Sequence, residues 1–233
     1  MVVAKREDLR RVRAGSIINV HSSKMESELI KALEKTVLLL DSEFEIELVH
    51  EPRIFLRDIV GDLRRDYPDV KFDYLFDTSF LLPDGGILYL KARDGTKRVV
   101  LISEAKRQGT NDLREAEGLK RQAKGNAIER LGKNVTGFRT WLRGEAIFPF
   151  VVFGQGVDFD TDSSILDRVT TIAMFAPLNT SEVHNVGENG MFNRGSFYFR
   201  ASEWEVDEMA GIMYEIAKRS IYYYFAKYGD DSF

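Results

Sequence analysis

Two acidic residues and a lysine lie in two short motifs near the middle of this 233-residue chain. The first motif is Pro83-Asp84-Gly85-Gly86, and the second, Glu104-Ala105-Lys106, follows an apolar run. Two carboxylates that face each other repel unless a cation lies between them, and oxygen ligands without nitrogen or sulfur favour Mg²⁺. A lysine beside such an ion could orient or help to deprotonate an attacking water molecule. These residue types therefore indicate metal-assisted hydrolysis of a phosphodiester.

A predicted β-hairpin carries both motifs. Its strands are Ile87–Lys91 and Arg98–Ser103, which are apolar and rich in β-branched residues. Between them, Arg93-Asp94-Gly95 fits a three-residue loop with its glycine in the left-handed conformation, so that Ala92 pairs with Thr96. A two-residue loop is the alternative, and it would shift the pairing by one residue.

With the three-residue loop, the register places Asp84 opposite Glu104 on one face of the sheet. Their Cβ atoms would then be about 4.5–5.5 Å apart. Lys106 lies on the same face because side chains alternate along a strand. A bulge at Gly85-Gly86 would change this register. The spacing therefore predicts that the three side chains meet, and carboxylates on opposite faces of the sheet would contradict it.

Each motif alone also has an ordinary structural interpretation. Pro83–Gly86 is typical of a turn, and Glu104–Lys106 is typical of a strand end that faces solvent. The segment Lys97–Arg143, however, holds twelve basic and five acidic residues, a local charge of +7 in a chain whose formal charge is −4. Such asymmetry is typical of a polyanion-binding surface or of a solvated helical face. The motifs and the charge together favour a nuclease.

The composition excludes several other classes of protein. The chain has no cysteine, which excludes disulfides, thiol nucleophiles and thiolate zinc sites, and its three histidines are scattered. No apolar run approaches the roughly 18 residues that cross a bilayer. The basic N-terminal segment lacks the apolar stretch of a signal peptide, so we expect a cytoplasmic protein. No Gly-rich phosphate loop ending in Lys-Ser/Thr is present, which argues against a nucleotide hydrolase.

Apolar periodicity and turn signals predict an α/β or α+β layered domain with central strands flanked by helices. We expect a single domain over 1–233, with an N-terminal helical part (about 1–70) and a C-terminal helix (about 203–228) added to its core. Ser23 and Glu26 have capping-box spacing at the start of a helix that runs to Asp41. Further helices are predicted at 54–66, 128–143 and 163–175, strands at 44–50, 72–82 and 148–153, and a loop after Pro177.

Three longer motifs contain these residues or follow them. They are Pro83-Asp84-Gly85-Gly86-Ile87, Glu104-Ala105-Lys106-Arg107-Gln108-Gly109 and Gly125-Asn126-Ala127-Ile128-Glu129-Arg130. They closely resemble motifs of the EcoRI-type restriction endonucleases, which belong to the PD-(D/E)xK nucleases. The first two are specific for the superfamily and the third for the subgroup, and the likeness covers roughly Leu81–Asp158. The resemblance implies an α/β fold with a central mixed sheet of about five strands flanked by helices.

The resemblance also implies an activity. Family members are type II restriction endonucleases that act as twofold homodimers on palindromic double-stranded DNA, cleave by in-line water attack and leave 5′-phosphate ends. Asp84 and Glu104 are the implied Mg²⁺ ligands, with the Ala105 carbonyl as a further ligand. Lys106 is the implied catalytic base or water-orienting group. Such an enzyme also needs a DNA methyltransferase in its host that protects the same site.

In this family the third motif is an extended chain that enters the major groove and is followed by a helix. The resemblance implies that Asn126 contacts adenine and Ala127 a thymine methyl group, pairings that suit the edges of these bases. Glu129 and Arg130 would join a network that links bases, phosphate and the other subunit. The expected recognition site has an AATT centre and is cut to leave a 5′ overhang.

The identity of the outer base pair of that site is not predicted. Thr171 stands where the type member of the family has a second arginine near this pair, and Lys124 stands where it has an alanine. Lys124 could hydrogen-bond guanine or contact phosphate. Gly125 would permit close approach of the backbone to DNA. Further candidates for DNA contact are Gln108 and Arg168.

Two rival interpretations are open at this point. A repair or junction-resolving nuclease of the same fold would recognise DNA shape, which leaves a base-reading residue such as Asn126 without a role. A non-catalytic sequence-specific DNA-binding protein would not need Asp84, Glu104 and Lys106 together. We therefore expect a type II restriction endonuclease.

Overall fold

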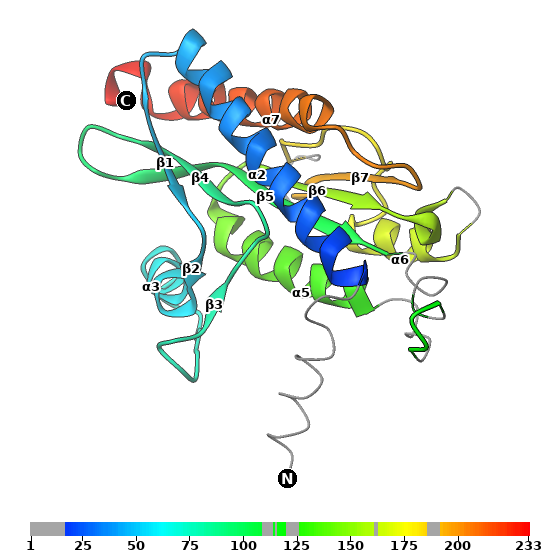
Figure 1. Cartoon of the computed structure of the whole chain (residues 1–233). Helices are drawn as coiled ribbons and strands as arrows, with labels where there is room; N and C mark the ends of the chain where they lie inside the picture. Colours follow the sequence, from blue (N-terminus) through cyan, green and yellow to red (C-terminus); the bar gives the residue numbers. More distant parts are fainter. Residues whose placement is uncertain (1–16, 109–113, 115, 120–125, 161–162, 186–191) are drawn as a thin grey trace.

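The fold is a mixed β-sheet with helices on both faces (Figure 1). The structure is a computed structural model, and it describes residues 17–108, 114, 116–119, 126–160, 163–185 and 192–233. Within these ranges, the side chains of residues 17–22 and of Asn126 are not described. No helix in the described ranges is both long and apolar enough to cross a membrane.

Five strands form the central sheet in the order β1-β4-β5-β6-β7. The pairs β1–β4 and β4–β5 are antiparallel, whereas β5–β6 and β6–β7 are parallel. This confirms the predicted α/β fold with a mixed five-stranded sheet. The strands are β1 (Glu47–Glu51), β4 (Gly86–Lys91), β5 (Lys97–Arg107), β6 (Phe150–Gln155) and β7 (Ser196–Arg200).

The sheet separates two hydrophobic cores. Along β6, Val151 and Phe153 point into one core, while Phe150 and Val152 point into the other. This period of two, with every residue buried, is typical of a strand covered on both faces. One face is covered by α2 (Ile17–Glu43) and α7 (Val206–Tyr228), and the other by α3 (Leu56–Asp66), α5 (Asn126–Trp141) and α6 (Ile165–Ile172) (Figure 1).

Smaller elements complete the described chain. A second sheet consists of β2 (Ile54–Phe55) and β3 (Phe80–Leu81), which pair antiparallel beside α3. Short 3₁₀ helices cover Leu142–Gly144, Val157–Phe159 and Asp230–Ser232.

The central hairpin has the predicted turn, and the predicted register holds only for the pairs next to it. Gly95 has a φ of +86°, and the Ala92 N–H donates to the Thr96 carbonyl at 2.8 Å, as expected for the three-residue loop. Further along, Tyr89 pairs with Val99 but Leu88 pairs with Leu101. The intervening residue of β5 is therefore a bulge, which shifts all later pairs by one residue. The prediction that Asp84 lies directly opposite Glu104 is wrong, because Gly86 already pairs with Ser103.

Several predicted boundaries also differ from the structure. Ser23 does not cap a helix, since α2 is already helical from Ile17. Of the β-prone stretch 72–82, only Phe80–Leu81 is a strand, and Leu75 there is 86% exposed, so aromatic and apolar composition did not imply burial. The stretch after Pro177, which was predicted to be a loop, contains the strand β7. Its five residues are too few to show a strand pattern on their own, and the strand is stabilised by pairing with β6.

The start of α5 departs from the expectation of an extended chain. Asn126–Arg130 form the first turns of this helix. Ile128, Leu131 and Val135 recur at helical intervals and are all at most 2% exposed. Burial of this stripe against the sheet favours the helical conformation from the first turn onward. Gly125, the residue before the helix, lies outside the described residues.

Candidate active site

Asp84, Glu104 and Lys106 form one cluster despite the shifted register. The Lys106 ammonium nitrogen lies 2.7 Å from Oδ2 of Asp84 and 2.5 Å from Oε1 of Glu104. Glu104 and Lys106 share a face of β5 because they are two residues apart in a strand. Asp84 reaches them from the loop that precedes β4. Two carboxylates and one ammonium group are thus in direct contact.

The Pro83–Gly86 loop is fixed against β5 by backbone contacts. The Gly85 N–H donates to the Ser103 carbonyl at 2.9 Å, and the Ala105 N–H donates to Oδ2 of Asp84 at 3.1 Å. A Cβ atom at Gly85 would lie only 2.1 Å from Oγ of Ser103. Any larger residue would therefore push the loop away from the strand. The glycine allows the Asp84 carboxylate to approach β5 closely.

Glu104 is the most buried member of the cluster, with 1% of its side chain exposed. Its Oε1 accepts hydrogen bonds from Lys106 and, at 3.0 Å, from Nδ2 of Asn134. Its Oε2 is buried and has no hydrogen-bond partner among the described residues. Burial raises the pKa of Glu104, the Lys106 charge partly offsets this, and the Asp84 charge raises the pKa further. A cation that contacted Oε2 would satisfy it.

Two carboxylates favour the charged form of Lys106 in this arrangement. Burial lowers the pKa of Lys106, but the charges of Glu104 and Asp84 outweigh burial, so its pKa lies above the ordinary value. The ammonium group also donates to the Ala105 carbonyl at 2.9 Å. In this state Lys106 can donate hydrogen bonds and supply positive charge, but it cannot accept a proton.

The oxygens around Lys106 also suit a metal ion. They come from the Asp84 and Glu104 carboxylates and the Ala105 carbonyl, the set that the resemblance implies for Mg²⁺. Mg²⁺ is commonly held by one or two carboxylates together with water and substrate phosphate. No group of three or more acidic or histidine side chains that could hold a metal occurs in the described part of the chain. The donors therefore fit an ion that shares its shell with DNA and water.

Glu26 of α2 is a further acidic residue at this site, and the sequence analysis did not identify it. Burial raises the pKa of Glu26, and the negative charge of Asp84 raises it further. Glu26 and Asp84 line one cavity of about 190 Å³ together with His50, whose Nε2 lies 3.0 Å from the Gly85 carbonyl. The available signal was the helical spacing of Glu26 with the buried Leu29 and Leu33, which places it beside the core stripe.

The structure describes some of the residues that we predict to contact DNA. Ala127 is half-buried and Glu129 and Arg130 are exposed in the first turns of α5, and Arg168 is exposed on α6. Helices α5 and α6 pack together near Gly132 and Ile172. Lys124, Gly125 and the Asn126 side chain lie outside what the structure describes.

Gln108 differs from the other candidates. It directly follows β5, is only 9% exposed, and its N–H donates to the Gln155 carbonyl at 3.0 Å. Its side-chain Oε1 is buried without a hydrogen-bond partner in the described part of the chain. Gln108 therefore lies under the surface beyond the end of β5, whereas Arg130 is exposed on α5.

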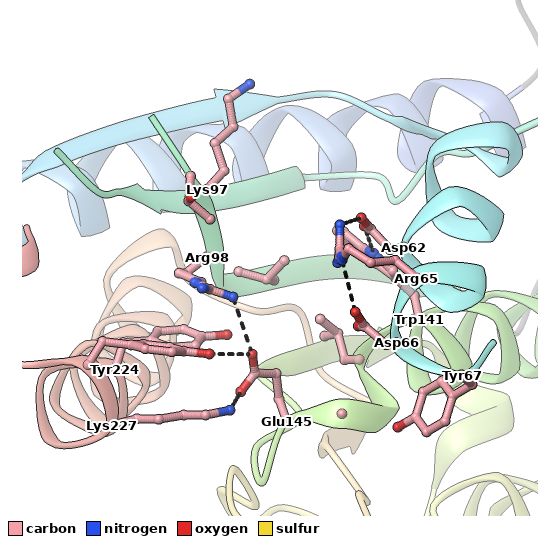
Figure 2. Close-up of a pocket in the computed structure, with 15 residues that line it drawn as sticks. Asp62, Arg65, Asp66, Tyr67, Lys97, Arg98, Trp141, Glu145, Tyr224 and Lys227 are labelled. Atoms are coloured by element: carbon pink, nitrogen blue, oxygen red, sulfur yellow. Dashed lines mark hydrogen bonds and ion pairs between the residues drawn. The ribbon is translucent and has the colours of Figure 1, made fainter. Parts of the chain in front are cut away.

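A larger cavity, of about 790 Å³, lies at the other end of β5 (Figure 2). It is lined by the start of that strand, by α3 and by the ends of α5 and α7. Its charged groups have ion-pair partners: Arg65 contacts Asp62 at 2.9 Å, Lys227 contacts Glu145 at 2.6 Å, and Lys97 contacts Glu51 outside the cavity. We therefore place the candidate active site at the Asp84 cluster, where an acidic oxygen is left without a partner.

Comparison with known proteins extends the resemblance to nearly the whole chain. The family model "Restriction endonuclease EcoRI" matches residues 13–230, well beyond the Leu81–Asp158 region of the motifs. The type II restriction enzyme RsrI of Cereibacter sphaeroides is 34% identical over 179 residues, which is 62% of this chain and 64% of RsrI. The match thus spans somewhat less than two thirds of the length of RsrI.

A second relative is matched over a longer region. The type II restriction enzyme EcoRI of Escherichia coli is 30% identical over 230 residues, 83% of this chain and 82% of EcoRI. Both relatives are named type II restriction enzymes, which are site-specific deoxyribonucleases. The family model covers most of the chain and this relative is matched over more than two thirds of both chains, so this chain belongs to the EcoRI restriction endonuclease family.

Proposed function

We propose that this protein is a type II restriction endonuclease that hydrolyses phosphodiester bonds of duplex DNA at a short palindrome with an AATT centre. The reaction uses Mg²⁺ and leaves 5′-phosphate ends and a 5′ overhang. The observation that carries the proposal is the contact of Lys106 with both Asp84 and Glu104 beside an unpaired carboxylate oxygen. Such a cluster combines cation ligands with a hydrogen-bond donor for a phosphate or a water molecule.

The contacts support the following roles for the residues. Asp84, Glu104 and the Ala105 carbonyl hold Mg²⁺, which supplies Lewis-acid chemistry when it is bound. Lys106 donates hydrogen bonds to the attacking water or to the phosphate and offsets the negative charge that develops there. Its raised pKa favours this role over that of a proton acceptor in the metal-free protein. The loop contacts of Asp84 keep the donor set in place before DNA binds.

DNA recognition is assigned to the start of α5 and to α6. Asn126 reads adenine, Ala127 contacts a thymine methyl group, and Glu129 and Arg130 link bases, phosphate and the second subunit. Lys124, Gly125, Gln108 and Arg168 are the remaining assigned contacts. A twofold homodimer matches the symmetry of a palindrome. A DNA methyltransferase of the host would modify the same site and so protect the host DNA from cleavage.

The direct test is to incubate the purified protein with plasmid DNA and Mg²⁺ and to sequence across the cut ends. We expect discrete fragments with a 5′ overhang centred on AATT, and the flanking bases then give the outer pair. Random degradation would instead support a repair nuclease of the same fold. Sharp binding to one sequence without cleavage at any metal concentration would support a non-catalytic DNA-binding protein.

Replacing Asn126 with alanine tests the recognition assignment. We expect specific binding to weaken by about 1–3 kcal/mol for each lost base contact. Non-specific, salt-sensitive binding should stay close to wild type because it depends on phosphate contacts. Both are measured by titration of cognate and random duplexes at two salt concentrations. Thr136→Ala, an exposed change on the same helix, is the control. An equal loss of both kinds of binding would make Asn126 a structural residue.

A further inference from the structure

The helix that begins with the recognition motif also contacts the buried catalytic glutamate. Asn134 lies in α5, eight residues after Asn126, and its Nδ2 donates to Oε1 of Glu104 at 3.0 Å. Among the described residues, Lys106 is the other group that contacts this carboxylate. One of the two groups that hold Glu104 therefore comes from β5 itself, and the other comes from the helix that carries the recognition motif.

The position of Asn134 relative to the start of α5 is set by regular helical structure. Eight residues of α-helix rise about 12 Å along the axis. Ile128, Leu131, Val135 and Phe138 lie along one stripe of this helix and are at most 2% exposed. The helix is thus packed against the sheet along its length, so a shift or rotation of its first turns also moves Asn134.

The orientation of Glu104 depends on few groups. The side chain is 1% exposed, so water cannot replace a lost donor without entering the core. Because Asn134 holds Oε1, the other oxygen, Oε2, is turned to a place where it has no described partner. Groups that orient a ligating carboxylate typically change metal affinity or activity by about 10–100-fold when they are removed.

We propose that Asn134 is a positioning residue that orients the Glu104 carboxylate, and that α5 thereby links the docking of the recognition motif on DNA to the geometry of the catalytic cluster. The linking part of this inference rests on the proposed function, whereas the positioning part concerns Glu104 and a bound cation alone. On a correct site, α5 holds Asn134 where it presents its amide to Glu104. On an incorrect site, displacement of the first turns of α5 weakens that hydrogen bond and slows cleavage.

The test compares three variants with the wild-type protein. Asn134→Asp keeps the shape of the side chain, removes the donor and adds a negative charge beside Glu104, whereas Asn134→Ala removes the donor and the side-chain volume without adding charge. Thr136→Ala is the matched control on the same helix, because this residue is exposed. Thermal unfolding of each variant establishes that it is folded. Because Asp and Asn have the same shape, a defect of the Asp variant cannot be attributed to a cavity.

The first readout is the single-turnover cleavage rate constant at saturating protein and Mg²⁺. We expect a decrease of about 10–100-fold for both Asn134 variants, with equilibrium binding to the specific duplex in metal-free buffer within about twofold of wild type. The Thr136→Ala control should cleave at the wild-type rate. Wild-type cleavage by Asn134→Asp would overturn the proposal.

The second readout is the ratio of cleavage rate constants on the cognate site and on a site with one changed base pair. If α5 links recognition to catalysis, the Asn134 variants lose rate mainly on the cognate site and this ratio falls. An equal loss on both sites would overturn the linking role.

The third readout is Mn²⁺ binding measured by calorimetry without DNA. We expect affinity to be about tenfold weaker in Asn134→Ala, which removes the donor without adding a carboxylate. Unchanged Mn²⁺ affinity of this variant would overturn the positioning role. If the wild-type protein cleaved no DNA but Asn134→Ala still weakened Mn²⁺ binding, the proposed function would fail while the positioning of Glu104 would stand.

Discussion

Replacement of Lys106 with alanine is expected to slow DNA cleavage by about 10²–10⁴-fold while specific DNA binding stays close to wild type. The ammonium group contacts Asp84 and Glu104 directly and is largely buried, so no exposed lysine can substitute for it. It is not one of the exposed residues to which we assign DNA contacts, such as Glu129, Arg130 and Arg168, which is why binding should survive. Single-turnover cleavage with Mg²⁺ and a binding titration without metal measure the two effects.

Two further variants separate catalysis from folding in this experiment. Lys106→Met keeps the packing of the aliphatic chain and removes the charge, and it should lose cleavage to the same extent. Lys35→Ala removes an exposed lysine that contacts Asp207 on α7, and it should cleave normally. Normal turnover by Lys106→Ala would exclude Lys106 from the chemistry.

The second large effect is expected from Asp84→Asn, which should abolish Mg²⁺-dependent cleavage at ordinary metal concentrations. The substitution keeps an acceptor for the Ala105 N–H, so the loop should stay in place. It removes one of the two carboxylates that supply charge to the cation, and Mg²⁺ depends on such ligands. Cleavage measured across a Mg²⁺ titration gives both the maximal rate and the metal concentration at half-maximal rate.

Asp94→Asn is the matched control, because Asp94 lies in the turn at the other end of the same hairpin and accepts a hydrogen bond from Thr96. We expect its metal dependence to equal that of the wild-type protein. If Asp84→Asn showed the same curve as this control, Asp84 would not be a metal ligand.

The sequence predicted the part of the site that depends on local geometry. The turn at Gly95 follows from the conformational freedom of glycine, and the shared face of Glu104 and Lys106 follows from the two-residue period of a strand. The bulge in β5 was not predicted, because an extra residue in a strand is set by packing on both faces of the sheet. Asp84 still lies in the cluster because it belongs to a glycine-containing loop, so its position does not depend on the strand register.

The residues that were missed reach the site from other elements. Glu26 was interpreted as the partner of Ser23 in a helix cap, yet it lies beside Asp84 because α2 packs across the sheet. Asn134 lies in the middle of a predicted helix, where nothing local distinguishes it from a solvent-facing residue. Both contacts depend on how a helix lies on the sheet, which residue spacing within one element does not determine.

The contacts of Lys106 have a consequence for the metal-free protein. The ammonium group already touches the Asp84, Glu104 and Ala105 oxygens, so the chain carries a tethered competitor for its own cation ligands. When divalent ions are scarce, the charge of Lys106 offsets the repulsion between the Asp84 and Glu104 carboxylates, so they stay close together. A divalent cation that used these oxygens together with the unpaired Oε2 of Glu104 would have to compete with Lys106 for part of its ligand shell. Its apparent affinity would then include the cost of displacing that internal cation.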